Sequence, residues 1–216
     1  MLRITHVEEI AQLLLSAQAL VQQQAERSYA FPESAVAWLA RAEQVLASRG
    51  IFQAGTIAAL RSEIIAAQHG QVPANVTFRG SPTRGKVRSA VAAHAVQRAV
   101  AVVSAIVEEN QPRFRLAEER MLQLVAVALA GGLIPPDDES IGRTDYLLDV
   151  RRRLLGSGYG DAVLALDSLV GPNDMLVMLD RALSLRNVVP VEVPARPPGG
   201  QPSAGMQGSL ASAAPA

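Results

Sequence analysis

The chain of 216 residues is long enough for one sizeable hydrophobic core or two small ones, and its 20 basic and 20 acidic residues exclude a general affinity for polyanions, so any such contact must be local. Hydrophobic residues make up 49% of the chain but aromatic residues only 4%, which predicts a core of Ala, Val, Leu and Ile. The absence of cysteine excludes disulfides, a thiol nucleophile and cysteine-ligated zinc.

The first predicted element is a helix from Thr5 to about Arg27. Thr5 and Glu8 have the spacing of a capping box, in which the hydroxyl accepts a free backbone N–H and the carboxylate reaches back to the start of the helix. Two more helices are predicted before residue 70. Pro32 suits a first helical turn and Gly50 a stop, which gives a helix over 32–49. A third helix covers 54–68 and ends at Gly70.

The glycines and prolines of residues 70–85 predict a long loop. Within it, residues 75–78 (NVTF) have the composition of a short strand, but no partner strand is evident elsewhere. Two helices follow, one over 86–109 and another from Pro112 to Ala130.

A second long loop, 131–143, leaves open a sub-boundary within the helical domain of residues 1–187. Shorter helices are predicted at 144–155, 161–169 and 173–187. The segment 188–216 carries six prolines and two charged residues, and this Pro/Gly/Ala-rich composition predicts a disordered C-terminal tail. The predicted fold is therefore an all-α multi-helix bundle of seven or eight helices followed by that tail.

The most apolar run of the chain, residues 121–136, favours a buried core helix over a membrane span. It is shorter than the roughly 20 apolar residues that a spanning helix needs, and glycines and prolines interrupt its end. The acidic pair Glu8–Glu9 breaks a signal-peptide pattern. We therefore expect a cytoplasmic protein with no membrane partner.

Gly80 and Gly85–Lys86 have the spacing G-x-x-x-x-G-K of a phosphate-binding loop. Val87 occupies the position of the Ser or Thr that holds magnesium in such a loop. The parallel sheet that carries such a loop is also not predicted here. The pattern therefore favours a flexible connection between helices over a nucleotide hydrolase.

A local excess of positive charge is the clearest feature of the same stretch. No acidic residue lies between Glu63 and Glu108, and four basic residues crowd into ten positions. These candidate anion or nucleic-acid contacts are Arg79, Arg84, Lys86 and Arg88. A solvated loop, a nucleic-acid contact and an acidic protein contact all fit this pattern. Phe78 is the only aromatic residue nearby in sequence, so a stacking platform for single strands is not predicted.

Arg88 and His94 have the R-x5-H spacing, which fits the R-x4-6-H pattern of the helical HEPN ribonuclease family. About 0.8 such pairs are expected by chance in this chain, and a packed histidine is favoured over a catalytic one. The three histidines lie on different segments, and the acidic run 137–139 favours a solvated loop. No metal site, cofactor or catalytic residue is predicted.

The leading functional hypothesis is a non-enzymatic helical interaction or assembly module that self-associates. It depends on stripes of small apolar residues that allow close helix approach, with packing in the monomer core as the alternative. The stripe residues are Val91, Val102, Val103, Ile106, Leu122, Val125 and Leu129. The second hypothesis is a nucleic-acid-binding protein that uses the basic loop 79–88. A nucleotide hydrolase or HEPN-like ribonuclease comes third.

Overall fold

Seven helices make up the part of the chain that the computed structural model describes, namely residues 2–73, 76, 83–136 and 141–188. They are α1 (Ile4–Ala25), α2 (Phe31–Ser48), α3 (Ala54–Gln68), α4 (Arg84–Ala130), α5 (Arg143–Leu155), α6 (Gly160–Val170) and α7 (Pro172–Val188). These ranges contain no strand, so the predicted all-α fold is confirmed. The strand proposed for 75–78, apart from Val76, and the tail from residue 189 onward lie outside the described residues.

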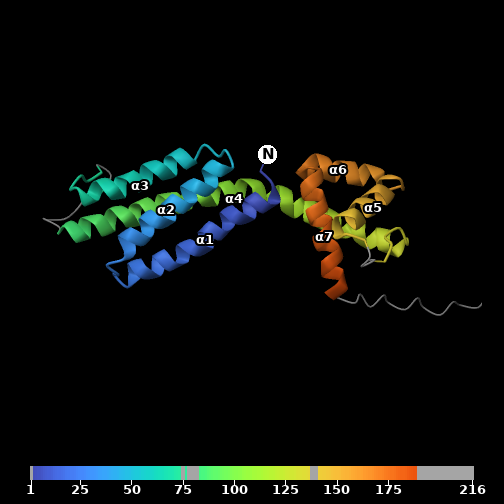
Figure 1. Ribbon diagram of the computed structural model, residues 1–216, viewed down its shortest axis with the longest axis horizontal. Helices are drawn as coiled ribbons and strands as arrows, with labels where there is room; N and C mark the ends of the chain where they lie inside the picture. The colour runs from blue at the N-terminus through green and yellow to red at the C-terminus, as the bar shows by residue number, and fades with distance from the viewer. Residues whose placement is uncertain (1, 74–75, 77–82, 137–140, 189–216) are drawn as a thin grey trace, which may run out of the picture.

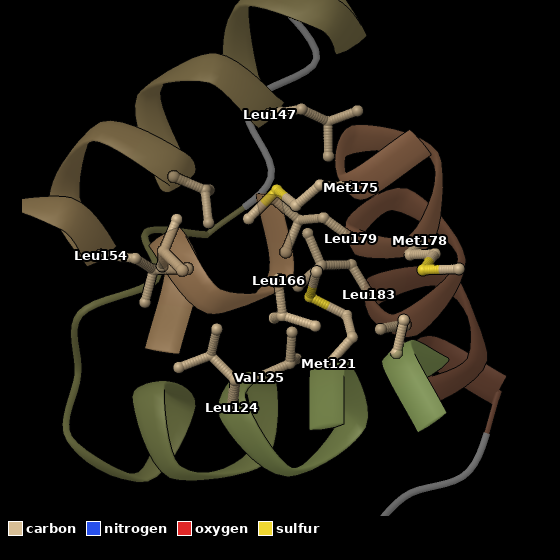
Figure 2. Close-up of a cluster of buried hydrophobic side chains, with 14 of the residues drawn as sticks. Met121, Leu124, Val125, Leu147, Leu154, Leu166, Met175, Met178, Leu179 and Leu183 are labelled. Atoms are coloured by element: carbon tan, nitrogen blue, oxygen red, sulfur yellow. The ribbon is translucent and has the colours of Figure 1, made fainter. Parts of the chain in front are cut away.

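The helix α4 is shared by two hydrophobic cores, which gives the molecule two lobes (Figure 1). In the N-terminal lobe, α1, α2 and α3 pack around residues 84–106 of α4. In the C-terminal lobe, residues 114–130 of α4 pack against α6 and α7, and α5 completes the cluster. Figure 2 shows how Leu and Met side chains from all four elements interdigitate in this second core. Because it takes side chains from both sides of the loop 131–143, this core extends across that segment.

The prediction of two helices, 86–109 and 112–130, is wrong, because α4 runs without a break through Pro112. An internal proline removes one helical hydrogen bond and clashes with the preceding turn, at a cost of about 3 kcal/mol. Pro112 is exposed and lies between the two cores, where water can solvate the carbonyl that loses its partner. Ile106 is buried on one side of it and Phe114 on the other, and this packing keeps the chain helical.

The predicted capping box at Thr5 and Glu8 is also wrong. The helix α1 begins at Ile4, its cap residue Arg3 makes no side-chain capping bond, and Thr5 lies inside the first turn. The backbone N–H of Ile4 instead donates to Oδ2 of Asp174 at 2.9 Å, a contact 170 residues apart in sequence. Asp174 is 4% exposed and is the one buried charged residue in the part of the chain that the structure describes. A carboxylate from α7 therefore caps α1.

Two further contacts join the start of the chain to the C-terminal lobe. Glu8 accepts hydrogen bonds from both terminal nitrogens of Arg181, at 2.5 and 2.9 Å. Arg113 donates to the carbonyl of Leu2 at 2.8 Å. Ile4 and Val7 belong to the C-terminal core, whereas the rest of the buried face of α1 belongs to the N-terminal core. The first turn of α1 thus fastens the two lobes together beside α4.

By length and composition alone, α4 could span a membrane, and so could α6 and α7 if their 115° bend is taken as a broken span. The apolar residues of α4 supply both cores, and a core helix has the same composition for that reason. Residues 121–130 form its last turns, and Met121, Leu124, Val125 and Ala128 are buried there, as predicted for a core helix.

We predict that Asp174→Ala lowers the free energy of unfolding by about 1–3 kcal/mol, because the buried N–H of Ile4 then has no acceptor. The matched control is Asp180→Ala on the same helix, which removes a partly buried ion pair with Arg143 near the surface and lowers stability by about 1 kcal/mol or less. Urea denaturation followed by circular dichroism measures both values. Equal stability losses in the two variants would contradict the capping role of Asp174.

Candidate functional site

A groove of about 770 Å³ lies at the end of the N-terminal lobe that is remote from the C-terminal lobe. The end of α1, the following loop and the start of α2 form one wall, and the first turns of α4 form the other (Figure 1). Its lining residues are Gln24, Arg27, Ser28, Tyr29, Pro32, Thr83, Gly85, Lys86, Arg88, Ser89, Ala90 and Ala93. The groove therefore joins two segments of the chain that are more than fifty residues apart.

All the charged residues in the described lining of the groove are basic. Arg27, Lys86 and Arg88 line the groove, and none of the described lining residues is acidic. Arg27 and Lys86 make no ion pair with any described residue, whereas Arg88 pairs with Glu33 outside the lining. The hydrogen bond from Arg88 holds the pKa of Glu33 below its usual range. The Nε of Arg88 is buried without a partner among the described residues.

The structure brings together two of the four basic residues that the sequence singled out. Lys86 and Arg88 both line the groove. Arg84 is the first residue of α4 and is exposed, but it does not line the groove. Arg79 lies outside the described residues, as does Gly80 of the G-x-x-x-x-G-K pattern. The described part of the basic stretch is thus the start of a helix, capped by the Thr83 hydroxyl, which accepts from the backbone of Lys86 at 3.4 Å.

Among the groove residues that the sequence analysis did not single out are Arg27 and Tyr29. Tyr29 is fully exposed and lines the groove. It adds an aromatic residue to the site, whereas Phe78 is the only aromatic residue near the basic stretch in sequence. Arg27 and Tyr29 both come from the short connection between α1 and α2, far from the basic stretch. The sequence held one signal for this turn: the first predicted helix ends at about Arg27, and no glycine stands there to terminate it.

The backbone of Arg27 is left-handed, with φ of 54°, the only positive φ of a non-glycine residue in the described ranges. The N–H of Arg27 donates to Gln24 and that of Ser28 to Gln23, at 3.1 and 2.9 Å. This is the Schellman termination, whose left-handed position strongly prefers glycine. The helices α2, α3 and α4 end in the same hydrogen-bond pattern with glycine in that place, at Gly50, Gly70 and Gly132. Only at the groove does arginine take the strained position.

His94, the second residue of the R-x5-H pattern, lies on α4 with Arg88. Six residues apart on one helix, the two side chains point about 120° away from each other. His94 does not line the groove, and it is half-buried with an Nδ1 that lacks a partner among the described residues. In the described part of the chain, no group of three His, Cys, Asp or Glu residues is placed to hold a metal. The acidic run 137–139 lies outside that part.

A second, apolar groove of about 380 Å³ lies between α4 and α6 in the C-terminal lobe. Its lining residues are Arg120, Gln123, Leu124, Val127, Tyr159, Ala162, Ala165 and Leu166. The alanines of α6 leave room beside Val127, which is 50% exposed. This groove has the chemistry of a contact with another apolar surface rather than with an anion.

No family model, curated protein or solved structure matches this chain. A functional assignment therefore depends on the geometry of these two grooves.

We predict that Arg27→Gly raises the free energy of unfolding by about 0.5–1 kcal/mol, because glycine adopts the left-handed backbone without the clash of a Cβ atom. Arg27→Ala removes the same side chain but keeps Cβ, so it should bring no such gain. At Gly50, an added Cβ meets no atom within 4 Å, so Gly50→Ala isolates the backbone effect and should destabilise. Thermal or urea unfolding measures all three, and a gain for Arg27→Ala equal to that for Arg27→Gly would contradict the strain.

Proposed function

We propose that the protein is a nucleic-acid-binding module whose groove between α1, α2 and α4 holds the phosphate backbone of its ligand. The observation that carries this proposal is the meeting of Arg27, Lys86 and Arg88 in one concavity whose described lining has no carboxylate. Such cations neutralise phosphates and release the counterions condensed on the nucleic acid, and this electrostatic contribution supplies a large share of the affinity of nucleic-acid-binding proteins.

The ion-pairing state of the three cations supports the same ligand. Arg27 and Lys86 pair with no carboxylate of the described residues, so binding a phosphate breaks no ion pair there. Arg88 shares its charge with the exposed carboxylate of Glu33, and surface ion pairs of this kind contribute little to stability. A phosphate can therefore compete for Arg88 at small energetic cost.

Hydrolysis is a weaker proposal for the same groove. Lys86 stands beside Val87, which offers no metal ligand where a phosphate-binding loop has Ser or Thr. Arg88 lines the groove and His94 does not, so the two side chains do not flank a common phosphate there. Binding without turnover fits these residues better.

We predict that binding weakens with salt and that Lys86→Ala lowers the slope of log affinity against log salt by about 0.7–0.9, the value of one lost phosphate contact. The matched control is Arg115→Ala, an exposed cation on the same helix about 43 Å further along its axis. Fluorescence anisotropy of labelled 20-nucleotide RNA and DNA, across a salt series, measures the slopes.

Three outcomes would contradict the proposal. The first is that the parent protein binds no oligonucleotide at low salt. The second is that Lys86→Ala has the same salt slope as the parent and Arg115→Ala. The third is that polyglutamate binds while nucleic acid does not, which would assign the groove to an acidic protein partner.

Self-association is the second candidate function. Most of the stripe on which it was predicted is used inside the monomer, since Val91, Val103, Ile106 and Val125 are all buried in its cores. What favours it is the apolar groove between α4 and α6, beside which Val127 is half-exposed. Burial of an apolar surface of this kind against a second copy of the chain would stabilise a dimer.

We predict that the protein sediments as a concentration-dependent oligomer and that Val127→Glu shifts it to the monomer, because a buried charge in the apolar groove opposes association. The matched control is Val21→Glu, at a position 60% exposed on α1 of the other lobe. Sedimentation velocity over a hundredfold concentration range measures both. A parent protein that stays monomeric throughout would remove this candidate.

A further inference from the structure

We infer that the ligand of the groove is single-stranded nucleic acid, with a base stacked on Tyr29 and the adjoining phosphates held by Arg27 and Lys86. This inference rests on the proposed nucleic-acid function and adds the structural class of the ligand. It follows from the position of the Tyr29 ring, from the way the chain holds that ring, and from the concave shape of the site.

The Tyr29 side chain is fully exposed in a chain with eight aromatic residues. It lines the groove beside the cations, so an aromatic face and a phosphate-binding surface adjoin. Stacking of a base on such a ring contributes about 1–3 kcal/mol and tolerates any base. Phe52 is also exposed, at 86%, but it lies in the loop between α2 and α3 and lines neither groove.

The backbone on both sides of Tyr29 is held in place. Before it, the Ser28 N–H donates to Gln23 and the Ser28 hydroxyl accepts from Ala30 at 3.3 Å. After it, the Phe31 side chain is 1% exposed and anchors the start of α2 in the core. A ring on a fixed backbone loses little conformational entropy when it binds, so more of the stacking energy appears as affinity.

The left-handed backbone at Arg27 is part of the same arrangement. The chain reverses its direction two residues after the end of α1, and this turn brings both Arg27 and Tyr29 to the groove. Glycine would make this turn with less strain but would bring no cation. The arginine therefore exchanges some stability of the turn for a contact with the ligand.

The concave site selects an unpaired strand. In a duplex, each base has both faces covered by its neighbours, so a tyrosine ring cannot stack on it without opening the helix. A single strand offers free base faces and a backbone that can follow a groove. We therefore expect oligothymidylate to bind more tightly than a duplex of the same length.

The experiment compares three fluorescein-labelled probes by anisotropy: a 12-nucleotide oligothymidylate, a 12-base-pair duplex, and an abasic strand with the same number of phosphates. The parent, Tyr29→Ala, Tyr29→Phe, Lys86→Ala and the control Phe52→Ala are titrated with each. Because Tyr29 and Phe52 are both exposed, their variants should fold, and circular dichroism checks this.

We expect Tyr29→Ala to weaken oligothymidylate binding roughly 5- to 150-fold, the equivalent of one lost stack, with no change in salt slope. Tyr29→Phe and Phe52→Ala should bind like the parent, and Tyr29→Ala should not change binding of the abasic strand. The parent should prefer oligothymidylate over the other two probes.

Two results separate the failure of this inference from the failure of the proposed function. If Tyr29→Ala binds oligothymidylate like the parent while Lys86→Ala still lowers the salt slope, the inference is overturned and nucleic-acid binding stands. If the duplex binds as tightly as the single strand, the inference is likewise overturned. If no probe binds to the parent, the proposed function itself is wrong.

Discussion

One helix that contributes to two cores is the constraint on which the rest of the structure depends. The 47 residues of α4 extend about 70 Å, and each half buries its apolar face in a different cluster. Neither lobe completes its core without α4, and the helix runs unbroken across Pro112 from one core to the other. The same continuity carries Lys86 and Arg88 to the far end of the N-terminal lobe, where α1 and α2 meet. The groove forms at this end because the first half of α4 completes the N-terminal core and its first turns reach the loop between α1 and α2.

The helix α1 connects the two ends of the N-terminal lobe, and each of its ends departs from the usual pattern in one respect. At its start, a carboxylate from α7 replaces a side-chain cap, and at its end an arginine replaces glycine. The hydrogen bond from Ile4 to Asp174 joins α1 to the C-terminal lobe, because the two residues meet only in the folded molecule. The arginine at the other end contributes a cation to the groove. At the start of α1, a contact that is distant in sequence takes the role that a neighbouring residue has in most helices. At its end, the hydrogen bonds stay local and only the glycine is replaced.

The sequence predicted the helices well where their signals are local and poorly where packing decides. Glycines at the left-handed positions after α2 and α3 marked their ends, so the predicted ranges 32–49 and 54–68 agree with the structure within a residue. Pro112 misled because its local penalty is known from sequence, whereas the packing that offsets it comes from two cores formed by distant residues. Lys86 and Arg88 were predicted because a basic stretch without acidic residues can be read directly from the sequence. Arg27 and Tyr29 were missed because only the folded chain brings them beside α4.

A net charge of zero hides the property on which the proposed function depends. Many arginines of this protein are paired with carboxylates on neighbouring helices, as Arg49 is with Glu9 and Arg61 with Glu43. Such pairs cancel in the total and also cancel in the local field, because each cation lies about 3 Å from its partner. Arg27 and Lys86 have no such partner among the described residues, so their charges contribute to the field of the groove without local cancellation. For a polyanionic ligand, the relevant quantity is thus the number of cations that one concavity leaves unneutralised, and this number is set by tertiary ion pairing rather than by composition.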